Sequence, residues 1–392
     1  MSSDPVPLWL DCDPGHDDVF AILLGAYHPG IRLLGISTVH GNAPLEKTTN
    51  NALSVLAAIG KHQGTDIKVY PGAAKALQRP PVNATAIHGE SGLDGTTLLP
   101  PPSAASSALD TSLSAVEAMR DALYGCEKGK AWIAATGAAT NVAALFANYP
   151  DLREHVAGVS FMGGSVGGKF TPAVMGRVDD VERIGNYSQW AEFNVLIDPE
   201  AAAAVLEDEV LRKKTTLVPL DLTHLVLATR EVRELLLRGK ATDSERGEGE
   251  AEGAKAKSTL RQMLVELLMF FAETYRDVFG IVEGPPLHDP LAVAAVLTGT
   301  EWEIPFYDFD PTKSEGPRTR ERFEVKVVTE GSIEDALLKG AQTGRTIVRL
   351  LEPGKEGVRI PRGVDIDMFW RVVEKCTERA DKENARRSAA AA

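Results

Sequence analysis

The sequence predicts an α/β fold with an open, mostly parallel sheet and helices on both faces. Short apolar segments alternate with helical patterns over the first 230 residues, and no Pro/Ser-rich linker interrupts them. This alternation is typical of parallel sheets, whose strands are joined by crossover helices. The chain has 392 residues, 44% of them hydrophobic and 25% charged, which is enough to bury a sizeable core. These observations favour one large domain.

The predicted strands are short apolar runs bounded by turn residues. In chain order they are VPLWL, IRLLGIST, IKVYPG, KAWIAAT, HVAGVSFMGG and TTLVPLDLT. Between them the apolar spacing predicts helices at 17–28, 45–60, 111–124, 139–148 and 198–207. Further on, RFEVKVV, GRTIVRLLE and GVRIPRGVDIDMFWRVVEKC predict a small C-terminal β-region closed by a helix. In such a fold, ligands bind at the carboxyl ends of the strands.

Two stretches break this pattern. Residues 240–258, KATDSERGEGEAEGAKAKS, are rich in charge, Gly and Ala and contain no large apolar side chain, so we expect a mobile insertion that is either a lid or passively disordered. The segment 381–392 is expected to be a disordered tail. The remaining residues 1–380 are expected to form a single domain around the insertion.

Composition excludes several classes of protein. Forty-two basic and fifty-five acidic residues give a net charge of −13, which disfavours nucleic acid and anionic membranes as partners. Cys12, Cys126 and Cys376 have neither the number nor the spacing for a disulfide framework or a CxxC zinc site. No apolar run reaches the roughly 18 residues of a membrane span, and the start, MSSDPVPLW, lacks the features of a signal peptide. A cytoplasmic location is therefore expected.

Four aspartates follow the first strand within eight residues. Asp11 and Asp13 lie on an extended segment, and Asp17 and Asp18 fall in the first turn of a helix. Capping a helix needs one acceptor, whereas four acids close together repel one another unless a cation or hydrogen bonds hold them. Carboxylates are hard donors, so calcium or magnesium suits the cluster better than zinc. The cluster is not an EF-hand, because that motif needs a Gly where this chain has His16.

Three further segments place polar residues at turns. His288 and Asp289 precede a helix and would supply a distant metal ligand beside a titratable group, although a solvated surface pair fits as well. Residues 135–141, ATGAATN, lie between a strand and a helix, where a Gly can leave a carbonyl free for a metal. In 186–194, NYSQWAEFN, amide and carboxylate groups suit a polyhydroxylated ligand, but each segment alone is also consistent with an ordinary turn.

Together these segments resemble the inosine-uridine preferring nucleoside hydrolases. The resemblance rests on DCDPGHDD at 11–18, HGN at 40–42, TGAATN at 136–141, MGGS at 162–165, AEFNVLIDPEA at 191–201, PLDLTH at 219–224 and HDPLAV at 288–293. These motifs occur in the family's order over residues 6–300. The resemblance implies an open α/β fold, hydrolysis of the N-glycosidic bond of ribonucleosides, a bound Ca²⁺ ion, and a homodimer or homotetramer.

For the metal, the resemblance implies roles for five residues. Asp13 corresponds to the general base that also touches the ion, and Asp18 to a bidentate ligand. Asp289 and the main-chain carbonyl of Thr136 complete the protein's share of the ligand set. Asp11 supports the site from behind. The ion would lower the pKa of its water, and Asp13 would take the proton as the water attacks C1′ of the ribose.

For the substrate, the resemblance implies three groups of contacts. Ribose hydroxyls and the sugar face are expected to meet Asp17, Asn42, Met162, Asn186, Glu192 and Asn194, with Asp289 also near the sugar. The departing base is expected to meet His288, the family's leaving-group histidine. His88 resembles a loop histidine near the base in pyrimidine-preferring members. Which of the two histidines protonates the base is left open.

The sequence departs from the family pattern at one insertion, and it leaves alternative substrates and two rival functions to consider. The insertion at 240–258 falls where the family closes over the base, and uridine is the leading substrate, with purine nucleosides or nicotinamide riboside as alternatives. A non-catalytic nucleoside-binding protein is a rival from another class. A haloacid dehalogenase-type phosphohydrolase is disfavoured, because its DxDx[TV] loop would need Thr or Val where this chain has Gly15.

Overall fold

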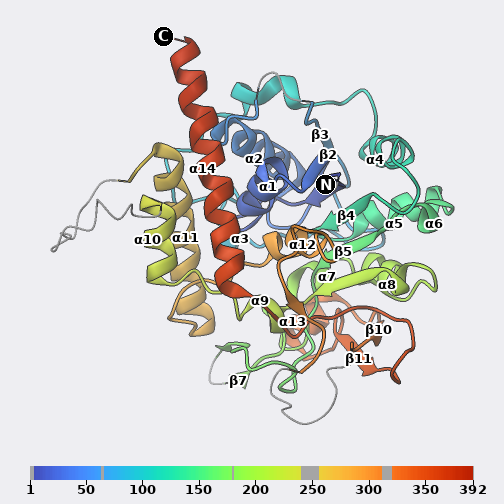
Figure 1. Cartoon of the computed structure of the whole chain (residues 1–392). Helices are drawn as coiled ribbons and strands as arrows, with labels where there is room; N and C mark the ends of the chain where they lie inside the picture. Colours follow the sequence, from blue (N-terminus) through green and yellow to red (C-terminus); the bar gives the residue numbers. More distant parts are fainter. Residues whose placement is uncertain (1–3, 63–65, 179–180, 240–255, 311–319, 392) are drawn as a thin grey trace.

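The fold is centred on a six-stranded sheet in which all neighbouring strands are parallel (Figure 1). A computed structural model describes residues 4–62, 66–178, 181–239, 256–310 and 320–391. The strand order is β3-β2-β1-β4-β5-β8. The strands are β1 (Val6–Cys12), β2 (Ile31–Thr38), β3 (Val69–Pro71), β4 (Trp132–Ala135), β5 (Gly158–Met162) and β8 (Thr215–Val218). The predicted parallel sheet is confirmed.

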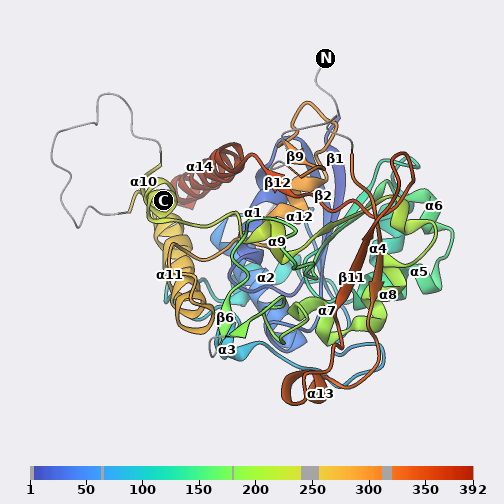
Figure 2. The same ribbon diagram turned by 90° about the horizontal axis from the view of Figure 1, so that it is seen from below.

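Helices cover both faces of this sheet, as predicted (Figure 2). Along β1, Leu8 and Leu10 join one apolar core, whereas Trp9, between them, joins the other. This alternation follows from the two-residue period of a strand. The first core contains α1 (Asp18–Tyr27), α2 (Leu45–Ala58), α11 (Thr259–Phe279), α12 (Asp289–Ala295) and α14 (Ile366–Ala391). The second contains α4 (Ala115–Tyr124), α5 (Thr140–Asn148) and α8 (Pro199–Leu206).

The predicted helix at 111–124 starts later than expected. It begins at Ala115, because Ser114 accepts a hydrogen bond from the backbone N–H of Glu117 and the Glu117 carboxylate accepts from Ser114 in return. This reciprocal pair satisfies N–H groups that a helix start leaves free. Shorter elements join the main ones: α3 (Thr85–His88), η1 (Pro102–Ala108), α6 (Leu152–His155), α7 (Phe193–Ile197), η2 (Leu211–Lys213), α9 (Leu220–Thr223) and α10 (Arg230–Arg238).

The C-terminal region is built from two-stranded ribbons and a long helix, as predicted. β10 (Phe323–Val327) pairs with β11 (Thr346–Leu350), and α13 (Ile333–Leu338) lies in the connection. β9 (Phe306–Tyr307) pairs with β12 (Gly363–Val364). A further ribbon in the middle of the chain pairs β6 (Arg177–Val178) with β7 (Val181–Glu182). The hydroxyl of Thr346 donates to the carbonyl of Ser165 over 2.5 Å, so the β10–β11 ribbon supports the loop that follows β5.

The disordered tail predicted at 381–392 is corrected by the structure, because residues 381–391 continue helix α14 (Figure 1). Its Asp381 accepts a hydrogen bond from Arg261 Nε over 2.6 Å. Further along, the Asn384 side chain donates to the carbonyl of Ala58 over 2.8 Å. The segment is rich in Ala, Arg, Lys and Glu, which favour helix, and these contacts supply the tertiary support that composition does not reveal.

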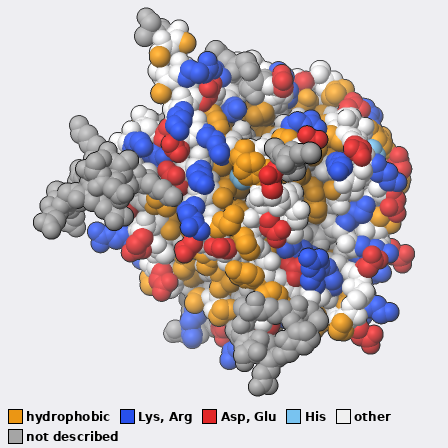
Figure 3. Space-filling view, in the orientation of Figure 1, with side chains coloured by type: hydrophobic (Ala, Val, Ile, Leu, Met, Phe, Trp, Pro, Cys, Tyr) orange, Lys and Arg blue, Asp and Glu red, His pale blue; other side chains and the backbone are white. Residues whose placement is uncertain are grey.

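Most of the predicted insertion, 240–255, lies outside the described residues. Its last residues are placed: the backbone N–H of Lys257 donates to the carbonyl of Leu237, and Ser258 caps α11. Among the described helices, none is both long and apolar enough to cross a membrane. On the face shown in Figure 3, basic and acidic side chains are interspersed.

Candidate active site

A pocket lies at the carboxyl ends of the sheet strands. Asn42 follows β2, Thr136 follows β4, and Met162 is the last residue of β5. The lining residues are Asp17, Asn42, Ala84, Ile87, His88, Thr136, Met162, Asn186, Glu192, Phe193, Asn194, Phe271, Tyr275, His288 and Asp289. Ten of the thirteen residues selected from the sequence are therefore brought together here. Of the other three, Asp13 and Asp18 accept hydrogen bonds from Asn42 and Thr136 of the lining, and Asp11 bonds to Ser37 and Asn141.

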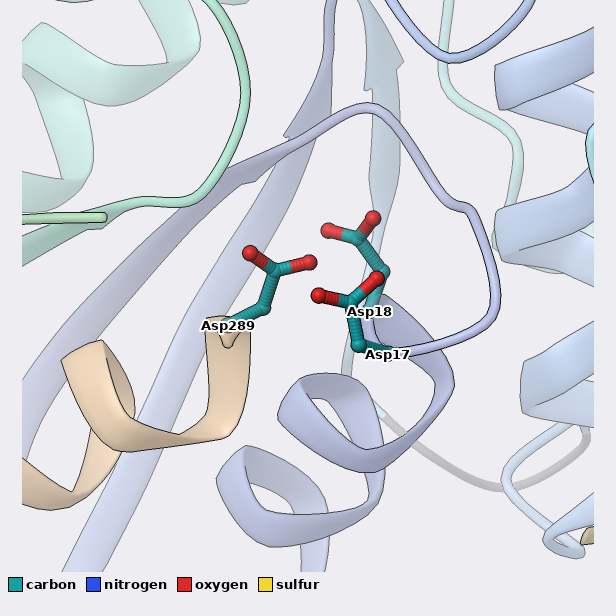
Figure 4. Close-up of side chains that lie close together, drawn as sticks. All are labelled: Asp17, Asp18 and Asp289. Carbon is teal, nitrogen blue, oxygen red and sulfur yellow. The ribbon is translucent and has the colours of Figure 1, made fainter. Parts of the chain in front are cut away.

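Three carboxylates meet on one side of this pocket. Asp17 and Asp18 come from the start of α1, and Asp289 comes from the start of α12 (Figure 4). Each contributes an oxygen, and these oxygens all lie within 4.8 Å of one another. All three side chains are buried. Residues from the beginning and the last third of the chain thus form one acidic cluster.

Asp13 lies beside this cluster on the segment that follows β1. Its Oδ2 accepts a hydrogen bond from the backbone N–H of Asn42 over 2.8 Å, whereas its Oδ1 is buried without a hydrogen-bond partner among the described residues. A Cβ at Gly41 would lie 1.9 Å from Oδ2, and a Cβ at Gly137 would lie 2.6 Å from Oδ1. Glycine at both positions therefore makes room for this carboxylate.

Burial and mutual repulsion raise the pKa values of these acids. Burial raises the pKa of Asp17 to about 7, with the Asp18 charge adding to the rise, and burial raises the pKa of Asp18 to about 6. The pKa of Asp13 and that of Asp289 lie well above the usual range, because burial is reinforced by the charges of neighbouring aspartates. Ionised together, these groups need a compensating cation.

The donor set fits a hard divalent cation. It consists of clustered carboxylate oxygens, the unpartnered Oδ1 of Asp13 and the nearby main-chain carbonyl of Thr136. Calcium and magnesium prefer such oxygen ligands, whereas zinc prefers sites with nitrogen or sulfur. Asp18 is oriented for this role, because its Oδ1 accepts from the Thr136 hydroxyl over 2.8 Å and its Oδ2 from the Gly15 N–H over 2.9 Å.

Asp11 supports the cluster from behind. Its Oδ1 accepts hydrogen bonds from the Ser37 hydroxyl at 2.5 Å and from the Asn141 amide at 2.8 Å. Burial raises the pKa of Asp11 to about 7, although both hydrogen bonds act against the rise. These bonds tie two adjacent strands to a helix, since Asp11 is on β1, Ser37 on β2 and Asn141 in the first turn of α5, which follows β4.

Polar groups from the segment 186–194 form a second wall. The Asn194 amide donates to the carbonyls of Thr136 over 2.9 Å and Met162 over 3.2 Å. Glu192 caps α7, since its carboxylate accepts from the backbone N–H groups of Asn194 and Val195, and it also accepts from Gly164. Burial raises the pKa of Glu192 to about 7. Both oxygens of Glu192 are thus engaged in holding backbone that frames the pocket.

His288 lies on the opposite wall and is held at both ring nitrogens. The Thr223 hydroxyl lies 2.7 Å from Nδ1, and the Tyr275 hydroxyl lies 2.6 Å from Nε2. Burial lowers the pKa of His288 well below its usual range, with His224 adding to the effect. Burial also raises the pKa of Tyr275 well above its usual range. The two hydrogen bonds therefore fix the orientation of a neutral imidazole at the pocket wall.

Sequence reasoning missed five lining residues, Ala84, Ile87, Phe193, Phe271 and Tyr275, and also His16 beside the pocket. Phe271 and Tyr275 line it from α11, and His16 contacts the lining residue His88. The available signal was the spacing of aromatic residues at 271, 275 and 279, which places them on one face of a helix. That spacing is also typical of an ordinary core face, so it did not single out the pocket.

Solved structures share this fold. The structure superposes on a purine-preferring ribonucleoside hydrolase from Gardnerella vaginalis with a TM-score of 0.69 at 23% identity, over 95% of this chain and 99% of the other. It superposes on a plant nucleoside hydrolase, PpNRh1, with a TM-score of 0.68 at 24% identity, over 96% and 99% of the two chains. The architecture is therefore that of the nucleoside hydrolase fold.

The chain belongs to the inosine-uridine preferring nucleoside hydrolase family, whose model matches residues 8–371. It is 38% identical to the uridine nucleosidase of Saccharomyces cerevisiae over 97% of this chain and 98% of that protein. It is 33% identical to a probable ribonucleoside hydrolase of Dictyostelium discoideum over 98% and 99%. Identity to the pyrimidine-specific ribonucleoside hydrolase RihA of Escherichia coli is 34%, over 74% and 79%. The protein is thus a hydrolase of N-glycosyl bonds in nucleosides, and the phosphohydrolase alternative is rejected.

Proposed function

We propose that the enzyme acts preferentially on uridine, which it hydrolyses to uracil and ribose. The observation that carries this proposal is a buried cluster of carboxylates beside a pocket that is lined by asparagine side chains and by His88. The 38% identity to a uridine nucleosidase over nearly the whole chain supports the choice of base. Purine nucleosides and nicotinamide riboside are the alternative substrates.

The metal in this proposal is Ca²⁺, held by Asp13, Asp18, Asp289 and the carbonyl of Thr136. The buried, clustered oxygens support a hard cation of this size and charge. When bound, the ion would supply positive charge that binds sugar hydroxyls and acidifies water. Asp17 lies in the same cluster and lines the pocket, which supports a role in holding a ribose hydroxyl close to these ligands.

Asp13 is the proposed general base. Its buried, unpartnered Oδ1 is free to accept a proton from a water molecule that attacks C1′, while its Oδ2 stays fixed by Asn42. Asp17, Asn42 and Asn194 would fix the vicinal hydroxyls, and Met162 would pack against the sugar. Such contacts hold the ring near its reactive geometry and discriminate against 2′-deoxyribose, because they would lose a partner.

The leaving base is proposed to meet His288 on its side of the pocket. Cleavage of the C1′–N bond places negative charge on the base, so a proton donor near it stabilises the transition state. The hydroxyls of Thr223 and Tyr275, 2.7 and 2.6 Å from the two ring nitrogens, would hold the His288 imidazole in place beside the base. Asn186 and Glu192, near the remaining wall, are proposed to hold the 5′ end of the ribose, Asn186 directly and Glu192 through the backbone that it fixes.

The proposal also covers the domain structure, the oligomeric state and the cellular location of the enzyme. We expect residues 1–380 and the rest of α14 to act as one catalytic domain, assembled as a homodimer or homotetramer in the cytoplasm. The net charge of −13 supports the expectation that neither nucleic acid nor a membrane is a partner.

The decisive experiment is a panel of uridine, cytidine, inosine, adenosine and nicotinamide riboside, assayed for ribose release by purified protein with calcium present. Uridine is expected to give the highest kcat/KM. A higher value for inosine or nicotinamide riboside would reject the proposed preference. Binding of uridine without any release of ribose would instead favour a nucleoside-binding protein that has lost turnover.

A further inference from the structure

The imidazoles of His16 and His88 make a contact that the mechanism above does not use. Their Nδ1 atoms lie 3.0 Å apart, and His16 Nε2 lies 2.8 Å from the main-chain carbonyl oxygen of Asp94. Both rings are buried, and of the two only His88 lines the pocket. The three groups therefore form a short chain of hydrogen bonds that ends at the pocket wall.

The carbonyl of Asp94 determines where the protons of this chain lie. A carbonyl oxygen can only accept, so His16 Nε2 must carry a hydrogen, and in a neutral ring Nδ1 then carries a lone pair. The 3.0 Å contact consequently requires His88 Nδ1 to donate. A neutral His88 then has no hydrogen on Nε2, so that nitrogen can only accept.

The opposite arrangement exchanges a short hydrogen bond for a longer one. In it, the backbone N–H of His16 and its Nδ1 would both donate to His88 Nδ1, the backbone contact being the longer one at 3.4 Å. His16 Nε2 would then be unprotonated and would face the Asp94 carbonyl at 2.8 Å with lone pair against lone pair. The 2.8 Å bond to the Asp94 carbonyl would thus be exchanged for the much longer 3.4 Å backbone contact, so the arrangement with the hydrogen on His88 Nδ1 is favoured.

The surroundings favour neutral rings. The His16 ring stacks on Phe270 and Phe271 with centroids 5.0 and 5.5 Å away and both planes inclined by 3°. The His88 ring also stacks on Phe271, at 5.4 Å. Apolar burial of this kind disfavours a charged imidazolium. In addition, a Cβ at Gly15 would lie 2.6 Å from His88 Nδ1, so glycine is needed for the close approach.

We propose that His16 is a positioning residue that fixes the hydrogen of His88 on Nδ1, so that His88 presents Nε2 to the nucleobase as a hydrogen-bond acceptor. The choice of ligand rests on the proposed function. Uracil carries an N–H at position N3, whereas cytosine carries a lone pair there. His88 in this state pairs with N3 of uracil and repels N3 of cytosine, and it cannot itself give a proton to the departing base.

The hydrogen position is tested without any assay of activity. Nitrogen-15 NMR of histidine-labelled protein distinguishes a protonated ring nitrogen from an unprotonated one, and the signals of His88 are assigned by their loss in His88→Asn. We expect the hydrogen on Nδ1 of His88 in the wild type. In His16→Phe, which keeps a stacked ring but removes the acceptor, a substantial fraction should move to Nε2. A wild-type His88 protonated on Nε2 would overturn the proposal.

The effect on base choice is tested with a pair of variants. His16→Phe should lower the ratio of kcat/KM for uridine to that for cytidine by about 3- to 10-fold, the usual effect of one hydrogen bond. His16→Asn, whose side-chain oxygen can replace Nδ1 as acceptor, should keep the ratio within about twofold of wild type. An unchanged ratio in His16→Phe would refute the specificity role. Absence of hydrolysis of every nucleoside would refute the proposed function, yet would leave the NMR result interpretable.

Discussion

Asp13 shows how a single residue depends on its neighbours for its chemistry. Its carboxylate is held by one backbone N–H and is surrounded by glycines at 41 and 137 that leave it room. Burial and the Asp18 charge keep the pKa of Asp13 high, so a cation is needed to make it an ionised base at neutral pH. In the proposed mechanism, Asp13 therefore acts as a base only when the cation is bound.

The first prediction concerns this base. Asp13→Asn should lower kcat for the preferred nucleoside by at least about 10²-fold, because the amide cannot take a proton from water. Circular dichroism and the urea unfolding midpoint should show that the fold is kept. Asp367→Asn, at an exposed position in the first turn of α14, is the control and should retain wild-type turnover. Near wild-type turnover in Asp13→Asn would remove Asp13 from the mechanism.

At the level of residues, the sequence was most informative where acids cluster next to a strand. Asp13, Asp17 and Asp18 could be selected from local spacing, and Asp289 through the family resemblance. Tyr275 and His16 could not be selected, because their relevance comes from contacts with residues far away in the chain. No periodicity indicates which distant side chain a histidine will meet.

Among the elements, α14 differs most from its sequence-based expectation. Its last turns hold Asp381, which binds the fully buried Arg261 of α11, and Asn384, which binds the end of α2. Arg261 also binds Glu374 of α14 and the Leu236 carbonyl of α10. Composition alone indicated a frayed end, because it does not reveal a buried cation elsewhere that needs a partner.

The second prediction follows from this contact. Deletion of residues 381–392 should lower the free energy of unfolding by about 3–5 kcal/mol, because it leaves a buried charge with only part of its compensation. Deletion of 389–392 alone, which spares Asp381 and Asn384, should change it by less than about 0.5 kcal/mol. Urea unfolding of both truncations gives the comparison. Equal stability of the two would show that Asp381 contributes nothing.

The third prediction concerns Glu192 at the start of α7. Burial raises its pKa from 4.5 to about 7, so the folded chain binds this proton more tightly than the unfolded chain. Its contribution to stability is complete below about pH 4.5 and is lost as the pH rises through about 7. In calcium-free protein, the free energy of unfolding of wild type minus that of Glu192→Gln should therefore fall by about 3 kcal/mol between pH 4.5 and 7.5.

Urea titrations at a series of pH values with chelator present measure this difference. Glu46→Gln, at an exposed position in the first turn of α2, provides the control for a change of charge at a helix start. A difference between wild type and Glu192→Gln that does not vary with pH would show that Glu192 is ionised equally easily in the folded and unfolded chains.

At the scale of the whole molecule, the mostly parallel sheet and its two helical faces followed from the alternation of apolar runs and helical patterns, whereas the order of strands in the sheet was not predicted. The start of α4 was displaced because a capping pair at Ser114 and Glu117 decides it more strongly than the apolar spacing does. The pocket could be placed at the strand ends from the fold class alone. Its aromatic wall could not, since α11 reaches it only through tertiary packing.

The fourth prediction concerns the cation as a link between distant parts of the fold. Because Asp18 is on α1 and Asp289 on α12, an ion bound to both should stabilise only the folded chain. Calcium at about 100 times its dissociation constant should add about 2.7 kcal/mol to the free energy of unfolding of chelated protein, seen as a rise in Tm. Asp289→Asn should lose this rise, whereas Asp277→Asn, in an exposed ion pair, should keep it.

Elemental analysis of active protein and thermal melts with calcium, magnesium and zinc complete this test. Calcium should be the metal found and should give the largest rise in Tm. Active protein that contains zinc, or no metal at all, would reject the calcium proposal.

The bond between Thr346 and Ser165 has a consequence for how the protein is made. A nascent chain that has not yet emerged beyond the β10–β11 ribbon lacks the hydroxyl that holds the loop after β5. Gly164 in the same loop donates to Glu192 of the pocket lining, so such a chain lacks one support of that wall. The pocket thus depends on a residue that the polypeptide delivers about 180 positions after the loop it steadies.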